Sequence, residues 1–177
     1  MAWTLEEFER LIELGFLDKD DRVELIGGEL VPMAAKGIRH EIVRTKLLNW
    51  VARRLPETLQ FGSELGWRPG GDNYAEPDIC VFPMGFEEPT VLPTELLLLI
   101  EVARSSLKFD REVKARLYAG LGVREYWVVD AAKVVTHVHR QPATGAYAEA
   151  FDVPKRGTAE PLLVPEIAVS LRDLMGE

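Results

Sequence analysis

The stretch Leu96-Leu-Leu-Leu-Ile-Glu-Val-Ala103 decides the fold class, because seven of its eight residues are apolar. Side chains alternate between the two faces of a strand, so an almost continuously apolar strand is one that is covered on both sides. Tyr126-Trp-Val-Val-Asp130 is a second buried strand of this kind, and residues 108–120 between the two have helical apolar spacing. These patterns predict an α/β (α+β) fold with a mixed β-sheet flanked by helices.

Turn residues and apolar spacing predict the other elements. A Thr-x-x-Glu capping box at Thr4 starts a helix that ends near Leu14, and alternating runs around Gly27-Gly28 predict a β-hairpin. Further expected elements are a helix over 38–55, strands at 59–61, 64–68 and 77–82, a hairpin within 134–151 and a short helix after Ser170. We expect one domain over 1–177, with an N-terminal helix and hairpin (about 4–33), a core (about 37–140) and a C-terminal hairpin and helix (about 141–177).

Composition narrows the class of protein. The 177 residues include 47% hydrophobic residues, which excludes intrinsic disorder, and a single cysteine, Cys80, which excludes a disulfide scaffold or a Cys-rich zinc site. No apolar run is long enough to span a membrane, and the N-terminus shows no secretory leader. We therefore expect a cytoplasmic protein without a membrane partner.

Charge is distributed unevenly along the chain. The net charge is −8, yet residues 36–54 contain six basic residues and one acidic residue, and residues 104–116 contain five basic and two acidic residues. An acidic protein with two basic segments is unsuited to broad nonspecific binding of nucleic acids but can hold a local anionic site. The alternative is that both segments are solvated helix faces.

Two acidic residues interrupt apolar strands. Glu101 follows four leucines and an isoleucine, and Asp78 precedes Ile-Cys-Val-Phe. A buried carboxylate is costly unless it is paired, protonated or bound to a cation. Strands that lie side by side would let these two carboxylates converge, and such oxygen ligands suit Mg²⁺ or Mn²⁺. The alternatives are a buried ion pair with an arginine for Glu101, and a bond to nearby backbone N–H groups for Asp78.

Lys114 is a third candidate, on the expected helix that follows the Glu101 strand. It lies four residues after Asp110 and therefore on the same helix face. It either reaches inward along the sheet or forms an ordinary surface pair with Asp110, which would contribute about 0.3–0.5 kcal/mol.

The motifs together resemble the Uma-type family of putative restriction endonucleases, within the PD-(D/E)XK nuclease superfamily. The resemblance runs from roughly Leu5 to Leu174. Its motifs are Val23-Glu-Leu-Ile-Gly-Gly-Glu29-Leu, His40, Pro77-Asp78, Ile100-Glu101-Val102, Asp110-Arg111-x-x-Lys114 with Tyr118, and Gly122-Val-Arg-Glu-Tyr-Trp-Val-Val-Asp130.

The resemblance implies a restriction-endonuclease-like core that hydrolyses DNA with Mg²⁺ or Mn²⁺. Asp78 and Glu101 would be the metal-binding acids, while His40 and Glu29 (or Glu24) would approach from the N-terminal part. The superfamily lysine normally stands two residues after the second acid, where this chain has Ala103. Lys114 would replace it from the next helix.

Further roles follow from the same resemblance. The catalytic set would be Asp78, Glu101, Lys114, His40 and Glu29, supported by Glu24, Asp110 and Tyr118. Phosphate contacts would come from Arg39, Arg44, Lys46, Arg104, Lys108 and Arg111. A homodimer or higher homo-oligomer is expected by analogy with nucleases that cut both strands. Ala103 and the net charge of −8 support the alternative, a catalytically inactive nucleic-acid-binding or protein-interaction module on the same fold.

Overall fold

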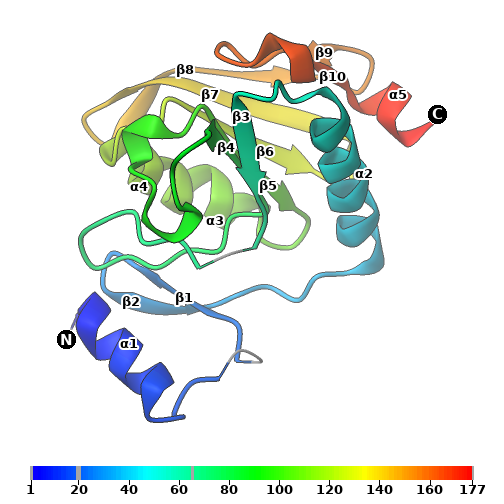
Figure 1. Cartoon of the computed structure of the whole chain (residues 1–177). Coiled ribbons are helices and arrows are strands. Elements are labelled where there is room, and N and C mark those ends of the chain that lie inside the picture. Colours follow the sequence, from blue (N-terminus) through cyan, green and yellow to red (C-terminus); the bar gives the residue numbers. More distant parts are fainter. Residues whose placement is uncertain (1, 19–20, 65, 177) are drawn as a thin grey trace.

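A six-stranded mixed sheet forms the centre of the molecule (Figure 1). The computed structural model describes residues 2–18, 21–64 and 66–176. Its strands lie in the order β3-β4-β5-β6-β7-β8; β5 and β6 are parallel, and all other neighbours are antiparallel. The bounds are β3 Leu59–Gly62, β4 Ile79–Pro83, β5 Leu98–Ala103, β6 Glu125–Asp130, β7 Val135–Ala143 and β8 Ala146–Val153. All residues of β5 and β6 are buried, so the expected mixed α/β sheet is confirmed.

Helix α2 (Ile38–Arg54) covers one face of the sheet. Its buried residues Val43, Leu47 and Val51 recur every four positions and form one apolar stripe. This stripe packs against β4, β5 and β6, and the C-terminal segment completes the layer. That segment comprises β9 (Thr158–Ala159), η4 (Pro165–Ile167), β10 (Val169–Ser170) and α5 (Leu171–Met175).

The opposite face is covered by the crossover between the parallel strands β5 and β6. This crossover comprises α3 (Leu107–Phe109), the π-helical turn η3 (Asp110–Lys114) and α4 (Ala115–Gly120). The Ala115 N–H donates to the Asp110 carbonyl five residues back, which defines the π turn. The expected helix over 108–120 is therefore present, with a widened turn in its middle.

The N-terminal part lies against one end of this core (Figure 1). Helix α1 (Leu5–Glu13) has the expected capping box between Thr4 and Glu7, and β1 (Val23–Ile26) pairs with β2 (Glu29–Pro32) as the expected hairpin. Leu25 forms an antiparallel bridge with Tyr74, which attaches the hairpin to the loop before β4.

The expected strand at 64–68 is wrong. Within the described residues of this stretch, Trp67 forms only an isolated bridge with Ala75. Its indole N–H donates to the Val91 carbonyl at 2.8 Å, and its ring is buried, so side-chain packing holds this segment as a loop. Two short 3-10 turns, η1 (Glu88–Thr90) and η2 (Pro93–Glu95), precede β5. No helix of the described residues is both long and apolar enough to cross a membrane.

Candidate active site

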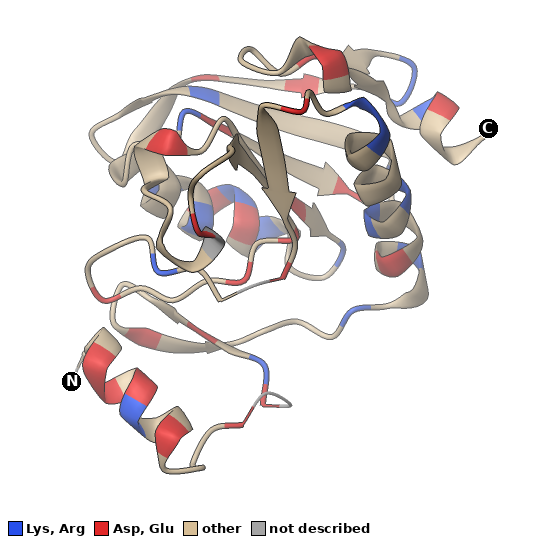
Figure 2. Ribbon diagram, viewed as in Figure 1, with Lys and Arg blue, Asp and Glu red and all other residues tan. Residues whose placement is uncertain are grey.

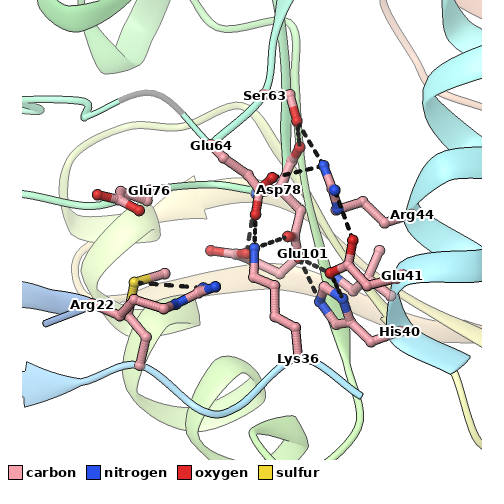
Figure 3. Close-up of polar contacts among 12 residues, drawn as sticks. Arg22, Lys36, His40, Glu41, Arg44, Ser63, Glu64, Glu76, Asp78 and Glu101 are labelled. Carbon is pink, nitrogen blue, oxygen red and sulfur yellow. Dashed lines mark hydrogen bonds and ion pairs between the residues drawn. The ribbon is translucent and has the colours of Figure 1, made fainter. Parts of the chain in front are cut away.

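The pairing of β4 with β5 brings the two buried acids together. Ile79 pairs with Ile100 in this antiparallel ladder, so the same register continued by one residue places Asp78 opposite Glu101. The Asp78 N–H donates to Glu101 Oε2 at 3.3 Å, and the Val102 N–H donates to Asp78 Oδ2 at 2.8 Å. The two carboxylates therefore lie close together, as expected, and Figure 3 shows both side chains.

Asp78 is contacted by a lysine and a histidine, from the start of α2 and the segment before it. Lys36 Nζ lies 3.1 Å from Asp78 Oδ1, and His40 Nε2 lies 3.3 Å from Asp78 Oδ2 (Figure 3). Burial opposes the charge on Asp78, but the hydrogen bond from His40 and the charge of Lys36 outweigh burial and lower its pKa to about 2. Asp78 is therefore an anion at neutral pH.

Glu101 lies in a different environment, on the side of the crossover helices. Lys114 Nζ lies 2.9 Å from Glu101 Oε1, and the Tyr118 hydroxyl donates to the same oxygen at 3.4 Å. Complete burial raises the pKa of Glu101 to about 8, although Lys114 acts in the opposite direction. The neighbouring acids Asp78, Asp110 and Glu24 raise it further. The positive charge of Lys114 therefore does not fully offset the effects of burial and of the neighbouring acids on the pKa of Glu101.

Lys114 is buried, so the alternative of a surface pair with Asp110 is wrong. Its ammonium lies 2.9 Å from a carboxylate oxygen of Glu24 as well as 2.9 Å from Glu101. Burial opposes its charge, but these two carboxylates hold its pKa well above the usual value. Lys114 is the last residue of the π turn, which directs it toward the sheet. Asp110, at the start of that turn, is also buried, and burial raises its pKa.

The N-terminal hairpin contributes Glu24 and not Glu29. Glu24 is buried, contacts Lys114, and accepts a hydrogen bond from the Glu76 N–H at 2.9 Å. Glu29 lies on the same face of the hairpin but pairs with Ile26 beside the turn, where its side chain is exposed. The structure therefore does not bring Glu29 to the acid pair, and the expectation for this residue is corrected.

Three of the expected phosphate contacts are engaged within the protein. Arg39 donates to the Ala131 carbonyl at 2.7 Å, and Lys46 donates to the Leu174 carbonyl at 3.0 Å. Arg44 pairs with Glu41 and Glu64, each at 2.8 Å. Figure 2 shows several basic positions, in blue, along α2. The other three, Arg104, Lys108 and Arg111, are exposed on the segment that follows β5.

Lys36 is a site residue that the sequence did not indicate. It contacts Glu64 in addition to Asp78 and so links the loop after β3 to the acid pair. In the sequence it is one of six basic residues between 36 and 54, and no spacing distinguishes it from the others. Its one distinguishing neighbour is Gly37, the residue that directly precedes α2.

A cavity of about 240 Å³ opens onto these residues. Its lining includes Glu24, Asp78, Glu101 and Lys114. The segment from Val31 to Lys36, Phe109 and the charged Arg22 and Arg104 also line it. The acid pair, although nearly buried, therefore borders a cavity that a small ligand can enter.

The donor chemistry of the acid pair fits a hard divalent cation. Among the described residues, no three or more His, Cys, Asp and Glu side chains converge to hold a metal ion by themselves. Mg²⁺, however, is commonly bound by one or two carboxylates, with water and substrate phosphates completing its ligands. The pKa of Glu101 is raised because burial and the neighbouring acids disfavour its negative charge, and a bound cation would offset this effect. Asp78 and Glu101 are thus suited to hold Mg²⁺ or Mn²⁺.

The family model Uma2, described as "Putative restriction endonuclease", matches residues 5–172. The chain belongs to this family. At this general level it is grouped with nucleases, as the sequence motifs predicted. No curated protein matches the chain.

One solved structure shares the fold along nearly its whole length. A crystal structure titled as a putative nuclease belonging to DUF820, from Anabaena variabilis, has a TM-score of 0.76 at 19% identity and covers 98% of this chain and 97% of its own. The type IIG restriction endonuclease BpuSI has a TM-score of 0.40 at 14% identity over 61% of this chain and 12% of its own. The first likeness confirms the nuclease-like mixed fold, and the second supports no inference.

Proposed function

We propose that this protein is a metal-dependent endonuclease that hydrolyses DNA phosphodiester bonds with a PD-(D/E)XK-type site. The observation that carries the proposal is Lys114, whose ammonium reaches Glu101 from the crossover helix. Ala103, at the usual lysine position, is completely buried in the apolar cluster under α4, where a lysine would not fit. A lysine from the helix therefore replaces one from the strand.

Asp78 and Glu101 would hold Mg²⁺ or Mn²⁺. When bound, such a cation supplies a Lewis acid and a water of lowered pKa. The charge on Asp78 is held by Lys36 and His40, so this carboxylate is ready to bind a cation at neutral pH. His40 also fixes the orientation of Asp78, because its Nε2 and the Val102 N–H both contact Oδ2.

Lys114 would act on the scissile phosphate or the attacking water. An ammonium beside the acid pair stabilises the negative charge that develops on the phosphate, or orients the water for attack. Glu24 holds this ammonium from the opposite side, so its role is to position Lys114. The exposed Arg104, Lys108 and Arg111 would contact neighbouring phosphates and make binding depend on salt.

The test is nicking of supercoiled plasmid in Mg²⁺ or Mn²⁺. We expect the wild type to nick the plasmid, EDTA to abolish nicking, and Asp78→Asn, Glu101→Gln and Lys114→Met to lose it. Lys133→Met is the matched control, because Lys133 is exposed and does not line the cavity. Cleavage that persists in all three site variants would contradict the proposal and indicate a contaminating nuclease.

Binding distinguishes the proposal from a catalytically inactive module. Such a module would bind labelled DNA equally well in EDTA and in Mg²⁺, and it would not cut. Circular dichroism of Lys114→Met checks that this variant folds, and Glu101→Gln, which preserves the size of the side chain, tests the same site if it does not. Sedimentation of the wild type tests the expected homodimer or higher homo-oligomer.

A further inference from the structure

We propose that the site accepts an unpaired nucleotide, so that its substrate is single-stranded DNA or an unpaired stretch within a duplex. This inference rests on the proposed nuclease function and names the form of DNA that it acts on. It follows from the burial of the acid pair, from the size and lining of the cavity beside it and from the charge around it.

The acid pair lies too deep for a phosphate on an intact duplex. Asp78 is 3% exposed, and Glu101 and Lys114 are each 5% exposed. The segment from Val31 to Lys36 lines the same cavity, and its Lys36 contacts Asp78. DNA duplexes are stiff over lengths of about 50 nm, so a duplex phosphate approaches only as far as the surrounding protein surface allows. A single strand can bend and enter.

The size of the cavity suits one nucleotide. Its volume of about 240 Å³ is just below the range of roughly 300–1,000 Å³ that is typical of pockets for drug-sized ligands. A phosphate with its sugar and base is a ligand of this order. A duplex would need an open groove that accommodates both strands.

The lining of the cavity suits the two ends of a nucleotide. The acid pair and Lys114 would face the phosphate and its cation. Val31, Met33 and Phe109 line the same cavity and are partly exposed, so they offer apolar surface against which an unpaired base can pack, beside the charged Arg22 and Arg104. Proteins that bind single strands combine positive charge along the backbone with aromatic rings that stack on the bases.

The charged surface around the site is also small. Arg39, Arg44 and Lys46 are engaged by carbonyl or carboxylate oxygens of the protein itself. Duplex affinity grows with the number of phosphates that are neutralised. Exposed basic residues on one segment, in a protein of net charge −8, suit a contact with a few nucleotides of one strand.

The test compares one labelled strand in three forms: single-stranded, fully paired, and paired except for a central bubble. We expect Mn²⁺-dependent cleavage of the single strand to be at least tenfold faster than that of the duplex, with cuts in the third form confined to the bubble. Equal or faster cleavage of the duplex would overturn the inference while leaving the proposed nuclease function intact.

Binding by Glu101→Gln decides the case in which no form is cut. That result contradicts the proposed nuclease function. Fluorescence anisotropy then measures the affinity of this variant for each of the three DNA forms. At least tenfold tighter binding to the single strand supports the inference. Equal binding to the three forms, or no binding to any of them, overturns it.

Two variants test the cavity itself. Ala34→Trp narrows its entrance at an exposed position, and Phe109→Ala removes the ring. We expect single-strand affinity to fall at least tenfold in the first and about fivefold in the second. Ala143→Trp and Phe86→Ala are matched controls at exposed positions that do not line the cavity, and they should stay within twofold. Unchanged affinity in both cavity variants would contradict the inference.

Discussion

The two sides of the acid pair differ in the charges that they place beside a buried carboxylate. On the side of α2, Asp78 lies beside Lys36 and His40, and its pKa is lowered to about 2. On the side of α3 and α4, Glu101 shares a single ammonium, Lys114, with Glu24, and its pKa is raised to about 8. The pKa values of these two residues, which lie opposite each other in one ladder, are thus shifted in opposite directions, because Asp78 has Lys36 and His40 beside it whereas Glu101 shares Lys114 with Glu24.

This difference assigns the two acids distinct parts in cation binding. Asp78 is already charged and oriented, so it provides a fixed ligand. The pKa of Glu101 is raised, so a cation bound beside it favours its ionised form. The following experiments would break or sharpen this contrast, from the largest expected effect to the smallest.

Removing the shared ammonium should have the largest effect on stability. Lys114→Met leaves Glu24 and Glu101 buried without their counter-ion, and breaking a buried ion pair in this way costs about 3–5 kcal/mol. Urea denaturation without metal measures the loss. The triple variant Lys114→Met with Glu24→Gln and Glu101→Gln should recover part of it, and a loss below about 1 kcal/mol in the single variant would show that the ammonium is not needed there.

The pH dependence of stability should have opposite signs for the two acids. The folded protein keeps a proton on Glu101 up to about pH 8, whereas the unfolded chain releases it near 4.5, so this contribution to stability falls as pH rises between these values. Asp78 contributes stability above about pH 3.8, and that contribution is lost as pH falls toward 2.

Urea denaturation in EDTA measures both contributions. Relative to wild type, Glu101→Gln should gain more than ~1 kcal/mol between pH 5 and pH 8, the free energy of one pKa unit. Asp78→Asn should be destabilised by about 2 kcal/mol at both of these pH values, and this deficit should shrink below pH 4. Glu29→Gln, at an exposed site, is the control. If the stability of both site variants relative to wild type changed with pH in the same direction, the proposed difference between Asp78 and Glu101 would be contradicted.

The two glutamates of the hairpin, Glu24 and Glu29, should differ in their effect on the rate of plasmid nicking. Glu24→Gln removes one of the two charges that hold Lys114, so we expect plasmid nicking to slow about tenfold, which corresponds to ~1.4 kcal/mol. Glu29→Gln should stay within twofold of wild type. Slower nicking in Glu29→Gln alone would mean that the hairpin contributes its other glutamate during the reaction.

Lys36 should affect cation binding more weakly. Its ammonium occupies a position 3.1 Å from Asp78 Oδ1 and repels an incoming cation. Lys36→Met should therefore tighten Mg²⁺ binding by roughly fivefold, or ~1 kcal/mol, in isothermal titration calorimetry. Lys133→Met provides the comparison at an exposed position. Weaker Mg²⁺ binding in Lys36→Met would show that this lysine supports the cation and does not compete with it.

The sequence predicted the elements whose signal is local. The apolar run around Glu101 and the break at Asp78 identified the central strands and their acids, since a charge in such a run needs a reason. The capping box at Thr4 and the glycine pair at the first hairpin predicted their elements correctly, because caps and turns depend on neighbouring residues.

The remaining features depend on contacts between distant residues. Lys36 becomes a site residue only because Glu64 and Asp78 fold beside it. The choice of Glu24 over Glu29 depends on how the hairpin docks at Tyr74. Lys46 belongs to a basic segment in the sequence, yet it binds the end of α5, 128 residues away. Residue type and spacing contain no record of such pairings.

The π turn has a consequence for how this lysine could change in related chains. It fits one residue more than an α-helix needs between Asp110 and Ala115. Each residue rotates an α-helix by ~100°, but a residue lost from this widened turn would leave a regular α turn, in which Lys114 still points toward the sheet. The turn therefore tolerates the gain or loss of one residue between Asp110 and Lys114, and a related chain of a different length here can keep its ammonium beside the acids.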